Sequence, residues 1–252
     1  MIWIRAIMAL GVAIAVLGAT GDAAEPLFER RALYCPAHFG NSYEVMGERE
    51  MRDMLAEAKH WGFNRYGDWF DTAGCSDPFV DPHYNMGRAL WDRKKRNFQT
   101  AQELGLECEL IITPNHMFLD QCRPDLLAKK EKRIFGQLIC PSIPEARAII
   151  LKNYENIFRD LADSGVRLAA LCPCPYDFGG CACEKCAPWI LTFAELTKEI
   201  AAIAEQYHPG IEMHFIGWWW QPEEHKFFAE WADREAPGWV KSISLHIPYG
   251  QT

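Results

Sequence analysis

Short apolar runs alternate along this chain with longer segments in which apolar residues recur every three or four positions. The short runs are typical of buried parallel strands, and they predict strands near residues 33–37, 63–68, 107–113, 167–172, 211–217 and 240–246. The longer segments have the spacing of amphipathic helices, and they predict helices over residues 47–62, 85–104, 144–165, 188–207 and 222–236. Regular strand–helix alternation predicts one parallel sheet with right-handed crossovers.

Polar, acidic and aromatic residues follow several of the predicted strands, which is where a TIM barrel carries its active site. The sequence therefore predicts the α/β class, with a TIM-barrel-like (β/α) parallel sheet. A doubly wound sheet is the alternative, although no Gly-x-Gly-x-x-Gly follows the first strand. Because a complete barrel has eight units, six predicted units suggest a barrel domain over residues 25–252 that is truncated after the sixth unit and incomplete at its C-terminus. The alternative is that residues 106–165 merge two short units.

The N-terminal segment has the layout of a secretory signal peptide. Arg5 precedes an uncharged apolar run over residues 6–19, and small residues follow as far as Ala24. The run is shorter than the ~20 residues that a membrane-spanning helix needs. We therefore predict a signal peptide over residues 1–24, a secreted or periplasmic location, and no membrane contact beyond the signal peptide.

The net charge and the aromatic content limit the classes of molecule that this protein is expected to bind. The 252 residues carry a formal net charge of -8 without basic runs, which argues against a nucleic-acid partner. Aromatic residues make up 13% of the chain and include ten Trp. Indole rings often line sites that bind flat apolar faces such as those of sugars, although packing in the core is their commoner role. A carbohydrate is therefore the predicted partner.

The segment Tyr176-Asp-Phe-Gly-Gly-Cys-Ala-Cys-Glu-Lys-Cys186 resembles secreted bacterial TIM-barrel proteins of the glycoside hydrolase superfamily, within a poorly characterised group. That group has an acid and a Cys-x-Cys-x-x-Cys motif after strand four. The stretch from Cys140 to Arg147 adds to the resemblance, which covers residues 30–250. The resemblance implies cleavage of glycosidic bonds in a polysaccharide or glycan by paired carboxylates. The β-N-acetylhexosaminidases of this wider set carry an Asp-Glu pair after strand four, whereas Phe178 follows Asp177 here.

Asp177 is the first catalytic candidate, as the general acid or the nucleophile of glycoside cleavage. Glycosidases place two carboxylates about 5–5.5 Å apart for retention and about 6.5–9.5 Å apart for inversion. Asp68, at the end of the second predicted strand, is the second candidate. Asp71, Glu223 and Glu224 are further candidates for the same role. The alternative for each acid is a loop carboxylate that caps a turn or faces solvent.

Residues that bind substrate are predicted at the same strand ends. Carboxylate, amide and imidazole groups hydrogen-bond sugar hydroxyls, and indole rings stack on sugar faces. The predicted set comprises Asp71, Asn115, His116, Trp218, Trp220, Glu223 and His246. Strand alternation would direct Trp218 and Trp220 to the same side. Packing between sheet and helices is the alternative role for both rings.

Five of the ten cysteines lie in one short stretch, at Cys172, Cys174, Cys181, Cys183 and Cys186. The Cys-x-Cys-x-x-Cys triplet with Cys172 or Cys174 as fourth ligand would suit a structural zinc. Disulfides between that triplet and Cys172 or Cys174 are the interpretation that export favours. Unpaired buried thiols are the third alternative. No cofactor is required for the predicted chemistry.

Two functions of different classes remain open from the sequence. One is a secreted glycoside hydrolase, and the other is a carbohydrate-binding or structural protein derived from a barrel, or an inactive fragment. The first and sixth predicted strands would be open edges of the sheet. Open edges pair readily with another chain, so an oligomer is expected.

Overall fold

The computed structural model describes residues 26–35, 45–80, 85–129, 138–175, 179–218, 220–235 and 238–245. The predicted signal peptide and two predicted site residues, Asp177 and His246, lie outside this part of the chain. None of the helices within these ranges is both long and apolar enough to cross a lipid bilayer.

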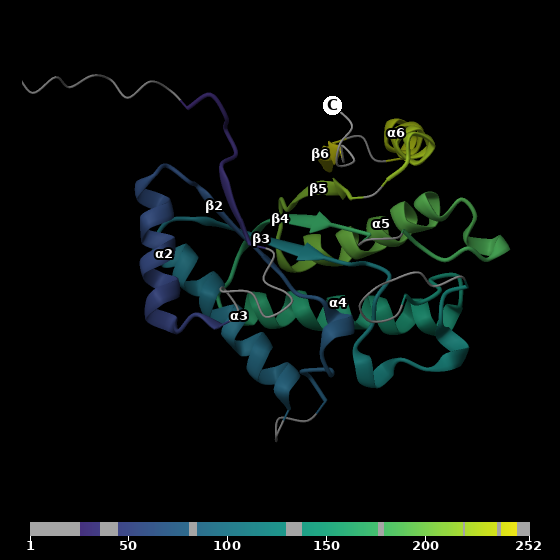
Figure 1. Ribbon diagram of the computed structural model, residues 1–252, viewed down its shortest axis with the longest axis horizontal. Coiled ribbons are helices and arrows are strands. Elements are labelled where there is room, and N and C mark those ends of the chain that lie inside the picture. Colours follow the sequence, from purple (N-terminus) through teal and green to yellow (C-terminus); the bar gives the residue numbers. More distant parts are fainter. Residues whose placement is uncertain are drawn as a thin grey trace, which may run out of the picture.

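Six parallel strands form one sheet in the order of the sequence, β1-β2-β3-β4-β5-β6 (Figure 1). The strands are β1 (Ala32–Cys35), β2 (Arg65–Trp69), β3 (Glu107–Ile112), β4 (Leu168–Pro173), β5 (Glu212–Gly217) and β6 (Val240–Leu245). Every neighbouring pair is parallel, which confirms the predicted α/β class and strand order. The sheet curls into an open half-barrel, like part of a TIM barrel.

Five α-helices connect the strands and cover the convex face of the sheet (Figure 1). They are α2 (Glu48–His60), α3 (Met86–Glu103), α4 (Pro144–Asp163), α5 (Trp189–Tyr207) and α6 (Pro222–Glu235). Aromatic contacts join the two layers. The Tyr66 ring of β2 lies 5.7 Å from the Phe98 ring of α3, and the Phe215 ring of β5 lies 4.6 Å from the Phe228 ring of α6. The principal core therefore lies between the sheet and its helices.

A glycine ends helix α3 and begins the connection to β3. Gly105 follows α3 with a φ of 75°, a left-handed conformation that costs glycine little. Its N–H donates to Gln102 O at 2.9 Å, and Leu106 N–H donates to Ala101 O at 2.9 Å. This Schellman pair stops the helix and turns the chain into β3. Short connections of this kind fix the strands in sequence order.

The long connection between β3 and α4, called the excursion below, contains two short 3-10 helices, η2 (Leu119–Gln121) and η3 (Pro124–Leu126). An isolated antiparallel bridge joins Leu127 to Ile139. The excursion therefore adds no parallel strand among the described residues, and β4 is the next strand after β3.

The described strands leave two edges, because β1 pairs only with β2 and β6 pairs only with β5. The side chain of Leu245 on β6 is 70% exposed. Exposed edges accept further strands readily, so self-association through β1 or β6 stays a prediction.

His208 joins three elements at the start of β4. It follows α5 and is fully buried. Leu168 N–H donates to His208 Nδ1 at 3.3 Å, and His208 Nε2 lies 3.2 Å from the carbonyl oxygen of Phe158 on α4. The ring therefore accepts at Nδ1 and donates at Nε2, which requires the neutral form. Burial lowers the pKa of His208 to about 4.

Because of His208, we expect the free energy of unfolding to decrease as the pH is lowered. The unfolded chain protonates this residue below its usual pKa of about 6.5, whereas the folded chain resists protonation down to about 4. Stability should therefore be complete above about pH 6.5 and decline by about 1.4 kcal/mol per pH unit between the two values. The test is urea denaturation of the wild type and the His208→Gln variant at pH 7, 6 and 5. The free energy of unfolding of the variant should depend less on pH, because the contribution of His208 is missing.

The matched control is His60→Gln, because His60 is exposed at the end of α2. That variant should keep the wild-type pH dependence. An unchanged slope in His208→Gln would show that the buried imidazole does not govern acid stability.

Candidate functional site

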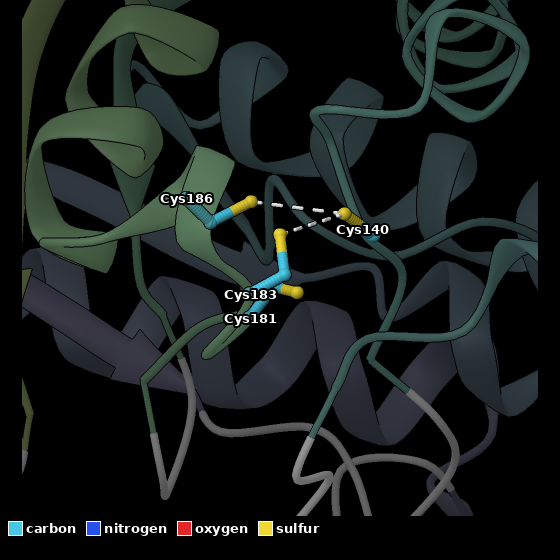
Figure 2. Close-up of side chains that lie close together, drawn as sticks. All are labelled: Cys140, Cys181, Cys183 and Cys186. Atoms are coloured by element: carbon cyan, nitrogen blue, oxygen red, sulfur yellow. Dashed lines mark hydrogen bonds between the residues drawn. The ribbon is translucent and has the colours of Figure 1, made fainter.

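Four cysteines from two segments that are distant in sequence come together in one cluster (Figure 2). They are Cys140, Cys181, Cys183 and Cys186, and their sulfur atoms all lie within 4.8 Å of one another. Cys183 is half-buried, and the other three are buried. This four-cysteine site joins the excursion before α4 to the loop between β4 and α5.

Backbone hydrogen bonds bring the two loops into contact. Cys140 N–H donates to Leu126 O at 3.0 Å, and Ala182 N–H donates to Lys129 O at 3.1 Å. Glu184–Cys186 form the 3-10 helix η4, and Cys186 N–H donates to Cys183 O at 3.0 Å. This tight turn places the thiols of Cys183 and Cys186 on the same side.

The distances between sulfur atoms suit a tetrahedral metal ion. Cys140 Sγ lies 3.8 Å from Cys183 Sγ and 3.7 Å from Cys186 Sγ. Four thiolates about 2.3 Å from one zinc ion lie about 3.8 Å apart, whereas a disulfide bond is about 2.05 Å long. No disulfide joins any two of the nine cysteines whose side chains are described. The disulfides that were predicted on the basis of export are thus absent from the described residues. The four sulfur atoms instead have the spacing of a metal site.

Hydrogen-bond donors surround the sulfur atoms. Lys129 N–H donates to Cys181 Sγ at 3.3 Å, and Ser142 Oγ lies 3.0 Å from Cys186 Sγ. Partial burial raises the pKa of Cys183, but hydrogen bonds from Cys186, Cys181 and the backbone outweigh burial and lower this pKa to about 7. Burial raises the pKa of Cys140 and of Cys186. Donors that point at sulfur stabilise thiolates and orient them toward a metal ion.

The fourth cysteine is Cys140, which corrects the expectation that Cys172 or Cys174 would complete the set. The reason is the length of β4, which continues through Pro173 instead of ending before it. Alternation along the strand then directs Cys172 and Cys174 to the same face, where they pack with Trp69 and Ile111. This face is the concave side of the sheet.

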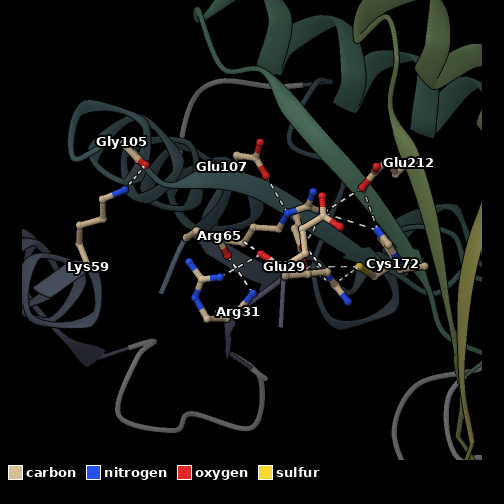
Figure 3. Close-up of polar contacts among 12 residues, drawn as sticks. Glu29, Arg31, Lys59, Arg65, Gly105, Glu107, Cys172 and Glu212 are labelled. Carbon is tan, nitrogen blue, oxygen red and sulfur yellow. Dashed lines mark hydrogen bonds and ion pairs between the residues drawn. The ribbon is translucent and has the colours of Figure 1, made fainter. Parts of the chain in front are cut away.

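A buried charge network occupies the concave side (Figure 3). Glu109 of β3 is 0% exposed and accepts hydrogen bonds from Arg30 Nε at 2.6 Å and from Arg65 Nη1 at 3.1 Å. Arg65 also donates to Glu212 Oε2 at 3.0 Å and pairs with Glu107. A buried carboxylate needs such partners because its desolvation is costly. The described carboxylates of this network are therefore ion-paired with arginine.

A pocket opens beside this network. Its lining combines an arginine, an imidazole, hydroxyl groups and aromatic rings, and it includes Arg30, Tyr34, Cys172, His214, Trp218, Ser242 and Ser244. His214 Nδ1 lies 2.7 Å from Ser242 Oγ, and burial lowers the pKa of His214 although Glu212 opposes the shift. The pocket therefore offers polar groups around a neutral imidazole, with the indole of Trp218 on the rim side.

The ends of β2, β3 and β4 meet at the rim. His116 Nδ1 lies 2.8 Å from Asp71 Oδ1, and Asn115 Nδ2 donates to Gly179 O at 3.4 Å. Asp71 Oδ1 also accepts from Ala73 N–H at 3.0 Å. The structure thus brings three predicted substrate-binding residues together, namely Asp71, Asn115 and His116. His116 and Asn115 are buried, so these contacts shape the rim from within.

Asp68 lies on the convex face of the sheet, which the helices cover. It shares the convex face with Tyr66, because β2 continues to Trp69 and places Asp68 within the strand. Its carboxylate accepts from Lys94 Nζ at 3.0 Å and from Tyr66 OH at 2.7 Å, and the residue is 0% exposed. This geometry gives Asp68 a structural partner on α3 and separates it from the rim where a catalytic acid was predicted.

Trp218 and Trp220 lie in different surroundings. Since β5 ends at Gly217, alternation does not extend to these residues. Trp218 lines the pocket, whereas Trp220 is 4% exposed and packs against Phe193 and Phe228. Glu223 is exposed in the first turn of α6. The roles predicted for Asp177 and His246 fall on residues outside those described.

The sequence interpretation missed Glu109, Arg30 and Arg65 as site residues. One signal was present, because Glu107 and Glu109 alternate in a strand that is otherwise apolar. Two acids with a period of two in a parallel strand indicate a charged concave face. Cys140 had no comparable local signal, since its partners lie more than 40 residues away.

No protein-family model matches this chain, and no curated protein matches it. A GH53 catalytic domain from Ignisphaera aggregans aligns with a TM-score of 0.48 at 13% identity, over 77% of this chain and 51% of that chain. An exo-β-1,4-mannosidase from Opitutaceae bacterium strain TAV5 aligns with a TM-score of 0.46 at 15% identity, over 73% and 31% respectively. A GH5_18 protein from Streptomyces cattleya gives 0.44 at 11% identity, over 74% and 44%.

The chain thus has a distant structural similarity to glycoside hydrolase TIM-barrel domains. It spans between 31% and 51% of the length of these three structures. The similarity concerns the fold alone, and a shared fold does not establish a shared function.

Proposed function

We propose that this chain binds carbohydrate in the concave pocket of a glycoside hydrolase-like half-barrel. The observation that carries the proposal is the combination of groups in one pocket: the indole of Trp218, the ring of Tyr34 and the hydroxyls of Ser242 and Ser244. Aromatic rings stack on the apolar faces of sugars, and hydroxyl groups exchange hydrogen bonds with sugar hydroxyls. The predicted signal peptide supports a secreted or periplasmic setting.

The reaction proposed for this pocket is hydrolysis of a glycosidic bond with Asp177 as the acid or the nucleophile. The support is the position of Asp177 in sequence, between β4 and the rim residue Gly179. Asp71 is the proposed second carboxylate, since it lies at the rim beside His116. Asp68 is not proposed for this role because its carboxylate is bound to Lys94 behind the sheet.

The second candidate function is carbohydrate binding without catalysis. The observation that favours it is that the described carboxylates of the charge network on the concave side are ion-paired with arginine. Glu107, Glu109 and Glu212 are each ion-paired with Arg65, and Glu109 is also paired with Arg30. Carboxylates held in this way recognise or exclude ligands but do not readily exchange protons with them.

We further propose that the four-cysteine site holds a structural zinc ion. Four thiolates at tetrahedral spacing form a closed zinc site, and such sites contribute directly to folding. Cys140, Cys181, Cys183 and Cys186 would supply all four ligands, and Lys129 N–H and Ser142 Oγ would orient two of them. The role of the ion would be to hold the two loops together.

The zinc proposal predicts one zinc per chain. Elemental analysis of the purified protein should find it, and Cys140→Ser should weaken retention by more than about 100-fold, since even changes around metal ligands cost about 10–100-fold. The matched control is Cys174→Ser, because Cys174 is equally buried but lies on the concave face. Equal zinc loss in both variants, or ten free thiols without metal in the wild type, would refute the proposal.

The binding proposal predicts a specific loss in Trp218→Ala. Isothermal titration with soluble manno-, cello- and chito-oligosaccharides should show affinity for at least one of them. Removing one stacking ring should weaken that affinity by about tenfold, given about 0.5–1.5 kcal/mol for an aromatic contact beyond its buried area. Trp61→Ala is the control, because Trp61 is exposed at the end of α2. An effect of equal size in both variants would place the sugar elsewhere.

The hydrolysis proposal predicts that Asp177→Asn retains binding and loses turnover. Loss of an acid–base group lowers the rate by about 10²–10⁴-fold. The test is release of reducing sugar from the oligosaccharide that binds, with Asp163→Asn as control because Asp163 is exposed on α4. Unchanged turnover in Asp177→Asn would exclude this residue, and binding without any turnover in the wild type would support the non-catalytic function.

A further inference from the structure

Trp189 lies between the four-cysteine site and the β5–α6 loop. It is the first residue of α5 and follows Cys186 by three positions. Its indole ring lies against the two glycines that precede Cys181. A Cβ atom built on Gly179 would lie 2.7 Å from Trp189 Cε2, and one on Gly180 would lie 3.1 Å from Trp189 Cβ. The two glycines that precede the cysteine turn are therefore in contact with the indole of Trp189, which follows the turn.

The indole of Trp189 also contacts the start of α6. Trp189 Nε1 donates a hydrogen bond to Glu224 Oε1, and the ring lies 6.4 Å from the Trp220 ring in an edge-on arrangement. Glu224 Oε2 accepts from Gln221 N–H at 2.7 Å, which closes the first turn of α6. These residues directly follow Trp218, which lines the concave pocket.

Three of the four sulfur ligands lie between Gly180 and Trp189. The Thr192 hydroxyl of α5 donates to Cys186 O at 3.2 Å, so the end of the cysteine turn is tied to the helix that carries the indole. Holding Cys181 and Cys186 at fixed positions fixes the backbone on both sides of the ring. Freeing the four thiols would leave the glycines without this constraint.

We propose that Trp189 couples the four-cysteine site to the β5–α6 loop, so that metal binding at the cysteines orders the loop beside the concave pocket. The inference rests on the metal site proposed above. Metal loading fixes the indole, and the indole fixes Glu224 and Trp220 through its N–H and its ring edge. Coupling between two sites is reciprocal, so a ligand that orders the loop should also tighten metal binding.

Hydrogen–deuterium exchange of the full chain tests this coupling, with and without zinc. In the wild type, removal of zinc by a chelator should raise exchange about tenfold in residues 179–188 and also in residues 220–228, which corresponds to a loss of about 1.4 kcal/mol of local stability. In Trp189→Phe, which keeps an aromatic ring but loses the N–H donor, zinc removal should raise exchange only in residues 179–188. Zinc stoichiometry should stay at one per chain in this variant.

The matched control is Trp231→Phe, which makes the same chemical change within α6. Trp231 Nε1 donates to Glu195 Oε1 of α5 at 2.6 Å, so the control also removes one indole bond between these two helices. Its response to zinc should equal that of the wild type. If Trp189→Phe fails to fold, Glu224→Ala removes the acceptor instead and should uncouple residues 220–228 in the same way.

The outcomes separate the two proposals. A wild type that binds no zinc refutes the metal site, and the coupling with it. A wild type that binds zinc but shows no change in residues 220–228 on chelation refutes the coupling alone. A Trp189→Phe variant that responds like the wild type shows that the loop is ordered by a route other than this indole.

Discussion

The ion pairs of Glu109 constrain the concave side of this sheet. A parallel sheet normally buries both faces, and here the convex face packs on helices while the concave face carries a carboxylate that is 0% exposed. Arg30 and Arg65 neutralise it, and removing one partner of a buried pair costs about 3–5 kcal/mol. The strands can therefore supply walls and polar groups to the pocket, but the acids of this network are committed to the fold. In the proposed hydrolysis, the reactive acid would therefore come from the loops at the rim.

Those loops have little apolar core of their own. The satellite cluster beneath them contains Ala128 and Leu138 and otherwise consists of the cysteines Cys140, Cys181 and Cys186. A cluster this small offsets little of the entropy lost when two loops are ordered. The metal ion proposed for the four-cysteine site would supply what this cluster lacks, because a closed metal site concentrates its stabilisation at one point. The long excursion after β3 reaches the principal core through Phe118, Leu126 and Ile139, and the four sulfur atoms join it to the loop after β4.

The order of strands and helices could be predicted because local signals agree with one another. Apolar runs, helical spacing and glycines such as Gly105 all mark the same boundaries, and a parallel sheet with short connections then follows. The site was harder because it depends on register and on distant pairs. One further residue in β2 moves Asp68 to the convex face, beside Lys94. One further residue in β4 extends the strand past Cys172, whose side chain then lies on the concave face, away from the cysteine turn.

The segment from β4 to Cys181 contributes to two sites, the concave pocket and the four-cysteine site. Within β4, alternation directs Cys172 to the concave side, where it approaches Arg30 and Glu109. Beyond the strand, the Gly179–Gly180 turn wraps around the indole of Trp189 and carries Cys181 to the outer cluster with Cys140. A side chain on Gly179 would collide with this ring, and its φ of 79° would also disfavour any other residue. Gly179 therefore makes it possible for the rim of the pocket and the four-cysteine site to share one short segment.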